Sequence, residues 1–160
     1  MAEAYLLTGG NTGDREAYLS KAAHQVAERC GPVLRRSSLY ETAAWGMEEQ
    51  PPFLNQVLLI KTALEPLRLL QTILSIEEAL GRKRTLKYGP RTIDIDILFY
   101  NDTILQLEGL HIPHPRIQDR RFVLVPLNEL APGKIHPVLQ KTLAALLKAC
   151  EDPLEVNKIS

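Results

Sequence analysis

The chain has 160 residues, of which 45% are hydrophobic and 24% charged, and its formal net charge is zero. These values are typical of one soluble globular domain, so we expect a single domain over residues 1–160. Zero net charge argues against a general nucleic-acid or anionic-membrane surface. The sequence holds no apolar run of membrane-spanning length, and its start, MAEAYLLTGG, lacks the features of a signal peptide. We therefore expect a cytoplasmic protein.

The first half of the chain predicts three strands and a helix. Residues 3–8 form an apolar run that ends at a glycine turn, which predicts a strand. Apolar residues then repeat at helical spacing between Asp14, a suitable N-cap, and the Gly-Pro pair at 31–32. Residues 33–42 and 53–62 are predicted strands, and an irregular loop separates them.

The second half begins with a helix from Pro66 that carries one apolar stripe. The stretch GPRTIDIDILFY at 89–100 alternates at period two and predicts a strand, with one face formed by Ile93, Ile95, Ile97 and Phe99. We expect a turn at residues 101–102 to fold this strand into a hairpin. FVLVPLNEL at 122–130 is compatible with a short helix or an extended segment, and a last helix is expected over 143–150.

The predicted order is strand, helix, strand, strand, helix, strand, followed by an appendage. This order predicts an α+β, ferredoxin-like fold, with an antiparallel sheet, helices on one face and a C-terminal appendage. The other sheet face would be left for binding. Cys30 and Cys150 fall on apolar helix faces and are expected to be buried free thiols.

Asp94 and Asp96 occupy the polar positions of the strand at 89–100. Side chains at i and i+2 point to the same side of a strand, with Cα atoms roughly 7 Å apart. Two like charges held so close repel each other. Either the pair lies on a solvated face near basic residues, or it binds a hard cation such as Mg²⁺.

Basic residues surround this acid pair in the sequence. The loop before it contains Arg82, Lys83, Arg84, Lys87 and Arg91, and a second set follows in His114, Arg116, Arg120 and Arg121. Two carboxylates among many guanidinium donors suit a polyphosphate held with Mg²⁺. A solvated charge run is the alternative for the loop. The glycine-rich TGGNTGD at 8–14 either contacts phosphate or forms only a tight turn.

A separate group of residues suits a flat ligand. Trp45, Phe53 and Phe122 lie outside the helical stripes, and Asn55 shares a strand face with Phe53. An amide beside an aromatic surface suits a heterocycle with an amide-like edge. Core packing is the alternative for the two phenylalanines.

These residues together resemble the 6-hydroxymethyl-7,8-dihydropterin pyrophosphokinase family. GPRTIDIDIL resembles the family signature, and TGGN, LYETAAWGMEEQPPFLNQV, IEEALGRKR and IPHPRIQDRRFVLVPL follow in the family order. The resemblance implies transfer of diphosphate from ATP to the pterin hydroxymethyl group in tetrahydrofolate biosynthesis, with release of AMP. It also implies a monomer that uses two Mg²⁺ ions.

The resemblance also implies roles for individual residues. The catalytic set would be Arg82, Arg91, Asp94 and Asp96, with both aspartates holding the metal ions. The ATP side would be lined by Glu77, Arg84, Tyr88, Arg91, Ile97, His111, His114 and Arg120. The pterin would be bound by Thr42, Ala43, Trp45, Phe53, Asn55 and Phe122, with the two phenylalanines sandwiching its ring.

Two other functions fit parts of the pattern. Another metal-dependent nucleotide enzyme could reuse the fold, but Phe53, Asn55 and Phe122 favour a pterin as acceptor. A ferredoxin-like RNA-binding module would need stacked aromatics and a basic face on its central strands. The acid pair and the zero net charge argue against such a module.

Overall fold

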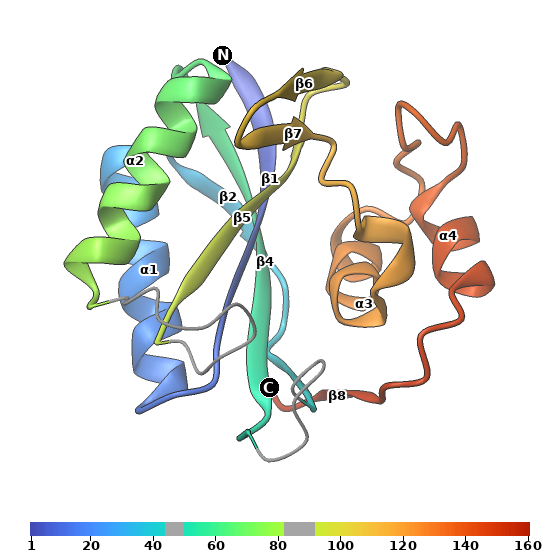
Figure 1. The fold of residues 1–160 in the computed structure, drawn as a ribbon, viewed down its shortest axis with the longest axis horizontal. Coiled ribbons are helices and arrows are strands. Elements are labelled where there is room, and N and C mark those ends of the chain that lie inside the picture. The colour runs from blue at the N-terminus through green and yellow to red at the C-terminus, as the bar shows by residue number, and fades with distance from the viewer. Residues whose placement is uncertain (44–49, 82–91) are drawn as a thin grey trace.

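The computed structural model describes residues 1–43, 50–81 and 92–160. Figure 1 shows a twisted sheet between two layers of helices. The elements are β1 (Ala2–Gly10), α1 (Arg15–Arg29), β2 (Val33–Arg36), β3 (Tyr40–Thr42), β4 (Phe53–Thr62), α2 (Pro66–Ala79), β5 (Asp94–Tyr100), β6 (Leu105–Leu107), β7 (Leu110–Ile112), the 3-10 helix η1 (Ile117–Asp119), α3 (Arg121–Leu130), α4 (Leu143–Ala149) and β8 (Val156–Lys158).

The main sheet runs in the order β5-β1-β4-β3-β8, and β2 also pairs with β4. Each of these pairings is antiparallel. The long strands β1 and β4 therefore form the centre of the sheet, with β5 beside β1. The predicted α+β fold with an antiparallel sheet is confirmed.

Helices α1 and α2 cover one face of the sheet, as expected (Figure 1). Their apolar stripes pack with β1, β4 and β5 in a core that includes Leu19, Val26, Ile73, Leu58 and Ile95. Asp14 caps α1, because its Oδ1 accepts a hydrogen bond from Ala17 N at 3.1 Å. Pro66 starts α2, where its missing N–H is not needed.

The C-terminal appendage folds onto part of the second face. Helices α3 and α4 pack there in a second core with Leu7, Val57, Leu59 and Leu98, and Figure 1 shows both helices on the side opposite α1 and α2. The face expected to be left for binding is thus partly covered by α3 and α4. The end of this face that carries Asp94 and Asp96 is polar, and it lies beyond the apolar residues that pack against α3 and α4.

The strand predicted over 33–42 is split into β2 and β3. Ser37 is 3% exposed at the break, and its hydroxyl accepts a hydrogen bond from Val57 N at 2.9 Å. A side-chain acceptor therefore takes the place of a backbone carbonyl in the pairing with β4. The expectation of one continuous strand was wrong for this reason.

Two details of the acid-bearing strand also differ from the prediction. The register of β5 on β1 shifts so that Leu6 pairs with Ile97 and Tyr5 with Phe99. This bulge sends Phe99 to the second core, away from the face expected for it. Residues 101–102 do form a turn, but they do not join a hairpin: β5 pairs with β1, and among the described strands β6 pairs with β7.

Residues 121–130 are helical, which decides between the two alternatives left open by the sequence. Cys30 and Cys150 are both buried and free, as expected. Burial raises the pKa of the Cys30 thiol to about 11, so it stays protonated. Across the described ranges, none of the helices has the length and apolar character needed to cross a membrane.

Candidate active site

One row of residues crosses four strands on the second face of the sheet. Gly9 lies opposite Asp94 on one side and opposite Asn55 on the other, and Asn55 lies opposite Tyr40. Residues opposite each other in an antiparallel pair point to the same face. Asp94 on β5 and Asn55 on β4 therefore lie on either side of Gly9, on the same face of the sheet.

Asp94 and Asp96 are both half-buried and lie on this face, whereas Ile93 and Ile95 point into the first core. Asp96 pairs with Leu7, next to the second core. The alternation predicted from the sequence is thus confirmed over the acid pair. The two carboxylates lie at the border between apolar packing and the polar end of the face.

Glu77 fixes the backbone between the two acids. It lies on α2, is 2% exposed, and its Oε2 accepts a hydrogen bond from Ile95 N at 2.7 Å. A buried carboxylate is stabilised when it accepts backbone N–H groups. The structure therefore places Glu77 behind the acid strand, and Ile97, also predicted on the ATP side, has its side chain in the first core.

The amide of Asn55 is held from one side only. Its Nδ2 donates to the carbonyl of Thr8 at 3.4 Å, while its Oδ1 is buried without a hydrogen-bond partner among the described residues. The hydroxyl of Thr42 is buried and likewise lacks a described partner. Buried polar atoms without partners are costly. These two atoms are therefore candidates for contacts with a ligand.

Gly9 makes room for this amide. A Cβ at Gly9 would collide with Asn55 Nδ2 and would lie 3.3 Å from the carbonyl oxygen of Leu54. Gly9 and Gly10 belong to β1 and not to the turn expected for them, and the missing side chain of Gly9 has a packing role. Phe53 lies opposite Thr42 and is half-buried, so its ring is available beside the two polar groups.

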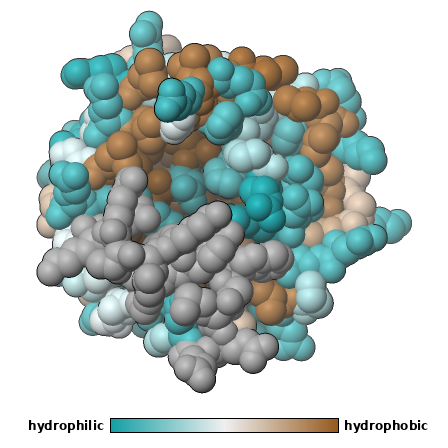
Figure 2. Space-filling view, in the orientation of Figure 1, coloured by the Kyte–Doolittle hydropathy of each residue, from teal (hydrophilic) through white to brown (hydrophobic). Residues whose placement is uncertain are grey.

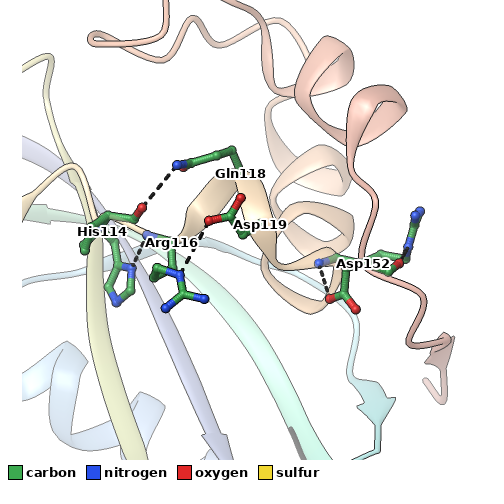
Figure 3. A network of polar contacts seen from close by, with 7 residues as sticks. His114, Arg116, Gln118, Asp119 and Asp152 are labelled. Atoms are coloured by element: carbon green, nitrogen blue, oxygen red, sulfur yellow. Dashed lines mark hydrogen bonds and ion pairs between the residues drawn. The ribbon is translucent and has the colours of Figure 1, made fainter. Parts of the chain in front are cut away.

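His114 lies close enough to Asp94 for the charge of that carboxylate to act on the histidine ring. Burial, followed by the charges of Arg120 and Arg116, lowers the pKa of His114 to about 4, while Asp94 opposes this shift. The ring is therefore neutral near pH 7. Its Nδ1 accepts a hydrogen bond from Arg116 N at 3.1 Å (Figure 3), which leaves the proton on Nε2.

The segment after His114 leads into α3. Arg116 Nε lies 3.5 Å from Asp119 Oδ2 (Figure 3). The guanidinium of Arg120 lies 5.7 Å from the centre of the Phe122 ring, and Phe122 is half-buried. His111 is exposed on β7, and its Nδ1 lies 2.7 Å from Gln106 Oε1.

Arg121 belongs to the structure of this segment. Its Nε and Nη2 each donate at 3.0 Å, to the carbonyls of Asp152 and Cys150. Asp152 Oδ2 also accepts from Arg121 N at 3.0 Å. The basic set that follows the acid strand is therefore divided: Arg121 anchors α3, and His114 and Arg120 remain near the acid pair and the Phe122 ring.

Two residues that the sequence did not single out hold the ends of the loop between β3 and β4. Asn11 is 2% exposed and donates to Gln50 Oε1 at 2.9 Å and to the carbonyl of Pro51 at 3.1 Å. Arg15 binds Glu41 Oε2 at 2.7 Å and the carbonyl of Pro52 at 3.1 Å. The TGGN motif contained Asn11, but nothing in its pattern indicated these distant partners.

Five of the predicted site residues lie outside the described residues: Trp45, Arg82, Arg84, Tyr88 and Arg91. Ala43 is exposed at the edge of the described part. Within the described ranges, no group of three or more His, Cys, Asp or Glu side chains is arranged to hold a metal ion. Figure 2 shows hydrophilic residues in the middle of this view of the molecule, with hydrophobic ones toward the top.

Known proteins share much of this sequence. The family model for 7,8-dihydro-6-hydroxymethylpterin-pyrophosphokinase (HPPK) matches residues 5–132. The chain is 47% identical over 162 residues to the 2-amino-4-hydroxy-6-hydroxymethyldihydropteridine pyrophosphokinase of Methylorubrum extorquens, with 99% of each chain covered. It is 45% identical over 143 residues to the protein of the same name from Aquifex aeolicus, with 89% of each covered.

Longer relatives contain a similar region. Wild-type HPPK-DHPS of Plasmodium falciparum, solved with pterin and p-hydroxybenzoate, aligns with a TM-score of 0.74 at 22% identity, over 92% of this chain and 41% of that one. At this identity the likeness shows the fold alone, and the chain spans less than half of that bifunctional protein. The sequence matches establish that the chain belongs to the 7,8-dihydro-6-hydroxymethylpterin-pyrophosphokinase family, which confirms the resemblance and the pyrophosphokinase function in folate biosynthesis predicted from it.

Proposed function

We propose that the protein transfers diphosphate from ATP to the hydroxymethyl group of 6-hydroxymethyl-7,8-dihydropterin, giving the pterin diphosphate and AMP. The observation that carries this proposal is the row formed by Asp94, Gly9 and Asn55. It joins an acid strand suited to a metal–phosphate complex with a buried amide suited to a heterocycle. Transfer between two substrates requires such adjacency.

The reaction needs positioning and charge neutralisation more than covalent help from the protein. The hydroxyl of the pterin is the nucleophile, and it attacks the β-phosphorus of ATP while AMP leaves. Arg82 and Arg91 are proposed to stabilise the charge of the migrating group, as the family resemblance implies. No protein nucleophile takes part in this scheme.

Asp94 and Asp96 are proposed to hold two Mg²⁺ ions. The support is that both carboxylates lie on one face, half-buried, and that Mg²⁺ takes one or two protein carboxylates together with phosphate oxygens and water. The bound ions would neutralise the phosphates and offset the repulsion between the two acids. Glu77 would keep the carboxylates in place through the amide of Ile95.

The pterin is proposed to lie between Phe53 and Phe122, with its amide-like edge toward Asn55. The Oδ1 of Asn55, which has no hydrogen-bond partner in the described part of the chain, would accept from a ring N–H, and the Thr42 hydroxyl would fill a second polar position. The backbone of Ala43 and Trp45 would contact the same edge. A buried amide that must find its partner in the ligand rejects analogues that lack the matching group.

ATP is proposed to lie along the segment from β7 to α3. A neutral His114 with its proton on Nε2 would donate to an oxygen of the nucleotide, and Arg120 would bind phosphate. His111, Ile97, Arg84 and Tyr88 complete the proposed ATP side. The resemblance also assigns Glu77 to the ATP side, and its hydrogen bond from Ile95 N supports an indirect role, in which Glu77 positions the strand that carries Asp94 and Asp96.

We expect the protein to be a monomer and to be located in the cytoplasm.

Product analysis tests the reaction. The purified protein is mixed with ATP, Mg²⁺ and 6-hydroxymethyl-7,8-dihydropterin, and each component is omitted in turn. We expect AMP only when all three are present. ADP in place of AMP would mean a single phosphoryl transfer, and no nucleotide product from folded protein would contradict the proposal.

A further inference from the structure

Glu129, on α3, accepts hydrogen bonds from Tyr40 on β3 and from Ser38 just before that strand. Its Oε1 accepts from Tyr40 OH at 2.6 Å and from Ser38 N at 2.9 Å. Its Oε2 accepts from Ser38 N and Ser38 Oγ, each at 3.1 Å. Burial alone would raise the pKa of Glu129, but these hydrogen bonds hold it below its ordinary value. The carboxylate is therefore charged near pH 7 and its bonds are charge-assisted.

Tyr40 stands between α3 and the candidate pterin site. It is 7% exposed and lies opposite Asn55 in the pairing of β3 with β4. Burial, followed by its hydrogen bond to Glu129, raises the pKa of Tyr40 to about 12, so it remains a donor. One side chain thus lies beside the buried amide while its hydroxyl is bound to α3.

Glu129 and Phe122 lie on the same side of α3. They are seven residues apart, which is close to two helical turns, and are separated by roughly 10 Å along the helix axis. Between them, Pro126 has no N–H to bond the carbonyl of Phe122. The first turn of α3 therefore lacks one internal bond, and its position depends more on contacts outside the helix.

We propose that Glu129 is a positioning residue for pterin binding. Through Tyr40 and Ser38 it fixes α3 against β3, so that the Phe122 ring keeps a set spacing from the amide of Asn55. This inference rests on the proposed function, because it takes Phe122 and Asn55 as the two sides of the pterin site. It predicts that loss of the contact weakens the binding of pterin and leaves that of ATP nearly unchanged.

Tyr40→Phe is the test variant, because it removes one hydroxyl and keeps the ring. The matched control is Tyr100→Phe, since Tyr100 OH also donates at 2.6 Å, to the carbonyl of Leu64, and lies away from the site. Calorimetry with the pterin alone and with Mg-ATP alone gives the two affinities. We expect Tyr40→Phe to weaken pterin binding by about tenfold and ATP binding by less than about twofold, and Tyr100→Phe to change neither.

A second variant links the effect to Glu129. Glu129→Gln should weaken pterin binding similarly, and the double variant should lose little more than either single one, because both act through one contact. Equal losses for pterin and ATP, additive losses in the double variant, or wild-type affinity in Tyr40→Phe would overturn the inference. Its failure is distinct from that of the proposed function, which is tested by whether the wild-type protein forms AMP and the pterin diphosphate.

Discussion

Gly9 and Asn55 lie opposite each other on β1 and β4, so closely that a methyl group on Gly9 would overlap the amide nitrogen of Asn55. We expect Gly9→Ala to displace this amide and to weaken pterin binding by at least about tenfold, because the amide loses its bond to the Thr8 carbonyl and its orientation. Calorimetric titration with the pterin measures the effect. Gly133→Ala is the matched control, since a Cβ there meets no atom within 4 Å. Equal affinities for the two variants would remove the packing role of Gly9.

Asp96→Asn should lower turnover by roughly a factor of 10³, because it removes a charge from the proposed metal site while keeping the shape of the side chain. The rate of AMP formation at increasing Mg²⁺ concentration measures the loss. Asp102→Asn serves as the control, since the Asp102 side chain is 86% exposed in the turn after β5. Near-normal turnover of Asp96→Asn at saturating Mg²⁺ would exclude a metal role for this carboxylate.

Phe122→Ala should weaken pterin binding more than ATP binding, because the ring is proposed to stack on the pterin. Phe122→Tyr keeps an aromatic surface and should bind pterin within a few-fold of wild type. Separate titrations with each ligand distinguish the two effects. Equal losses for pterin and ATP in Phe122→Ala would contradict the sandwich and favour a purely structural role for the ring.

Glu77→Ala should destabilise the fold by about 1–3 kcal/mol, because the buried amide of Ile95 would lose its acceptor. The neighbouring Glu78 is exposed, so Glu78→Ala should change stability by less than about 0.5 kcal/mol. Urea denaturation of both variants gives the comparison. If the two variants were equally stable, the hydrogen bond of Glu77 would contribute nothing that water cannot replace.

The lowered pKa of His114 makes stability depend on pH. The folded state binds the His114 proton only near pH 4, whereas the unfolded chain binds it near the ordinary value of 6.5. Unfolding therefore takes up a proton between these values, so the contribution is fully present above pH 6.5 and is lost as pH falls toward 4. The slope is at most about 1.4 kcal/mol per pH unit.

Denaturation of the ligand-free protein at several pH values measures this slope. We expect His114→Gln to flatten it between pH 6.5 and 4, and His24→Gln to leave it unchanged, since the His24 side chain is 69% exposed. An unchanged slope in His114→Gln would mean that other groups account for the acid sensitivity.

The local sequence pattern was sufficient to predict an element where the spacing of its apolar residues matches the residues that are buried in the fold. The alternation of Asp94 and Asp96 with Ile93 and Ile95 predicted a strand with two acids on one face, and the structure has it. The stripes of α1 and α2 were equally clear. The bulge that turns Phe99 to the other face could not be predicted, because one extra residue in a strand leaves no mark in composition.

Contacts between distant residues were also beyond the sequence. Glu129 and Tyr40 are separated by 89 positions, and neither belongs to a motif that indicates the other. Asn11 and Arg15 hold the ends of the β3–β4 loop through similarly distant partners. The chemistry of the candidate site was therefore visible in its acids, amide and aromatics, whereas the residues that position them depend on the folded arrangement.

The mass of the pterin product tests the central claim most directly. Wild-type protein is incubated with ATP, Mg²⁺ and 6-hydroxymethyl-7,8-dihydropterin. The pterin is then recovered, and its molecular mass is measured by mass spectrometry. The account predicts a pterin that carries two phosphate groups, formed in equal amount to AMP. A pterin with one phosphate group, or an unmodified pterin beside consumed ATP, would contradict it.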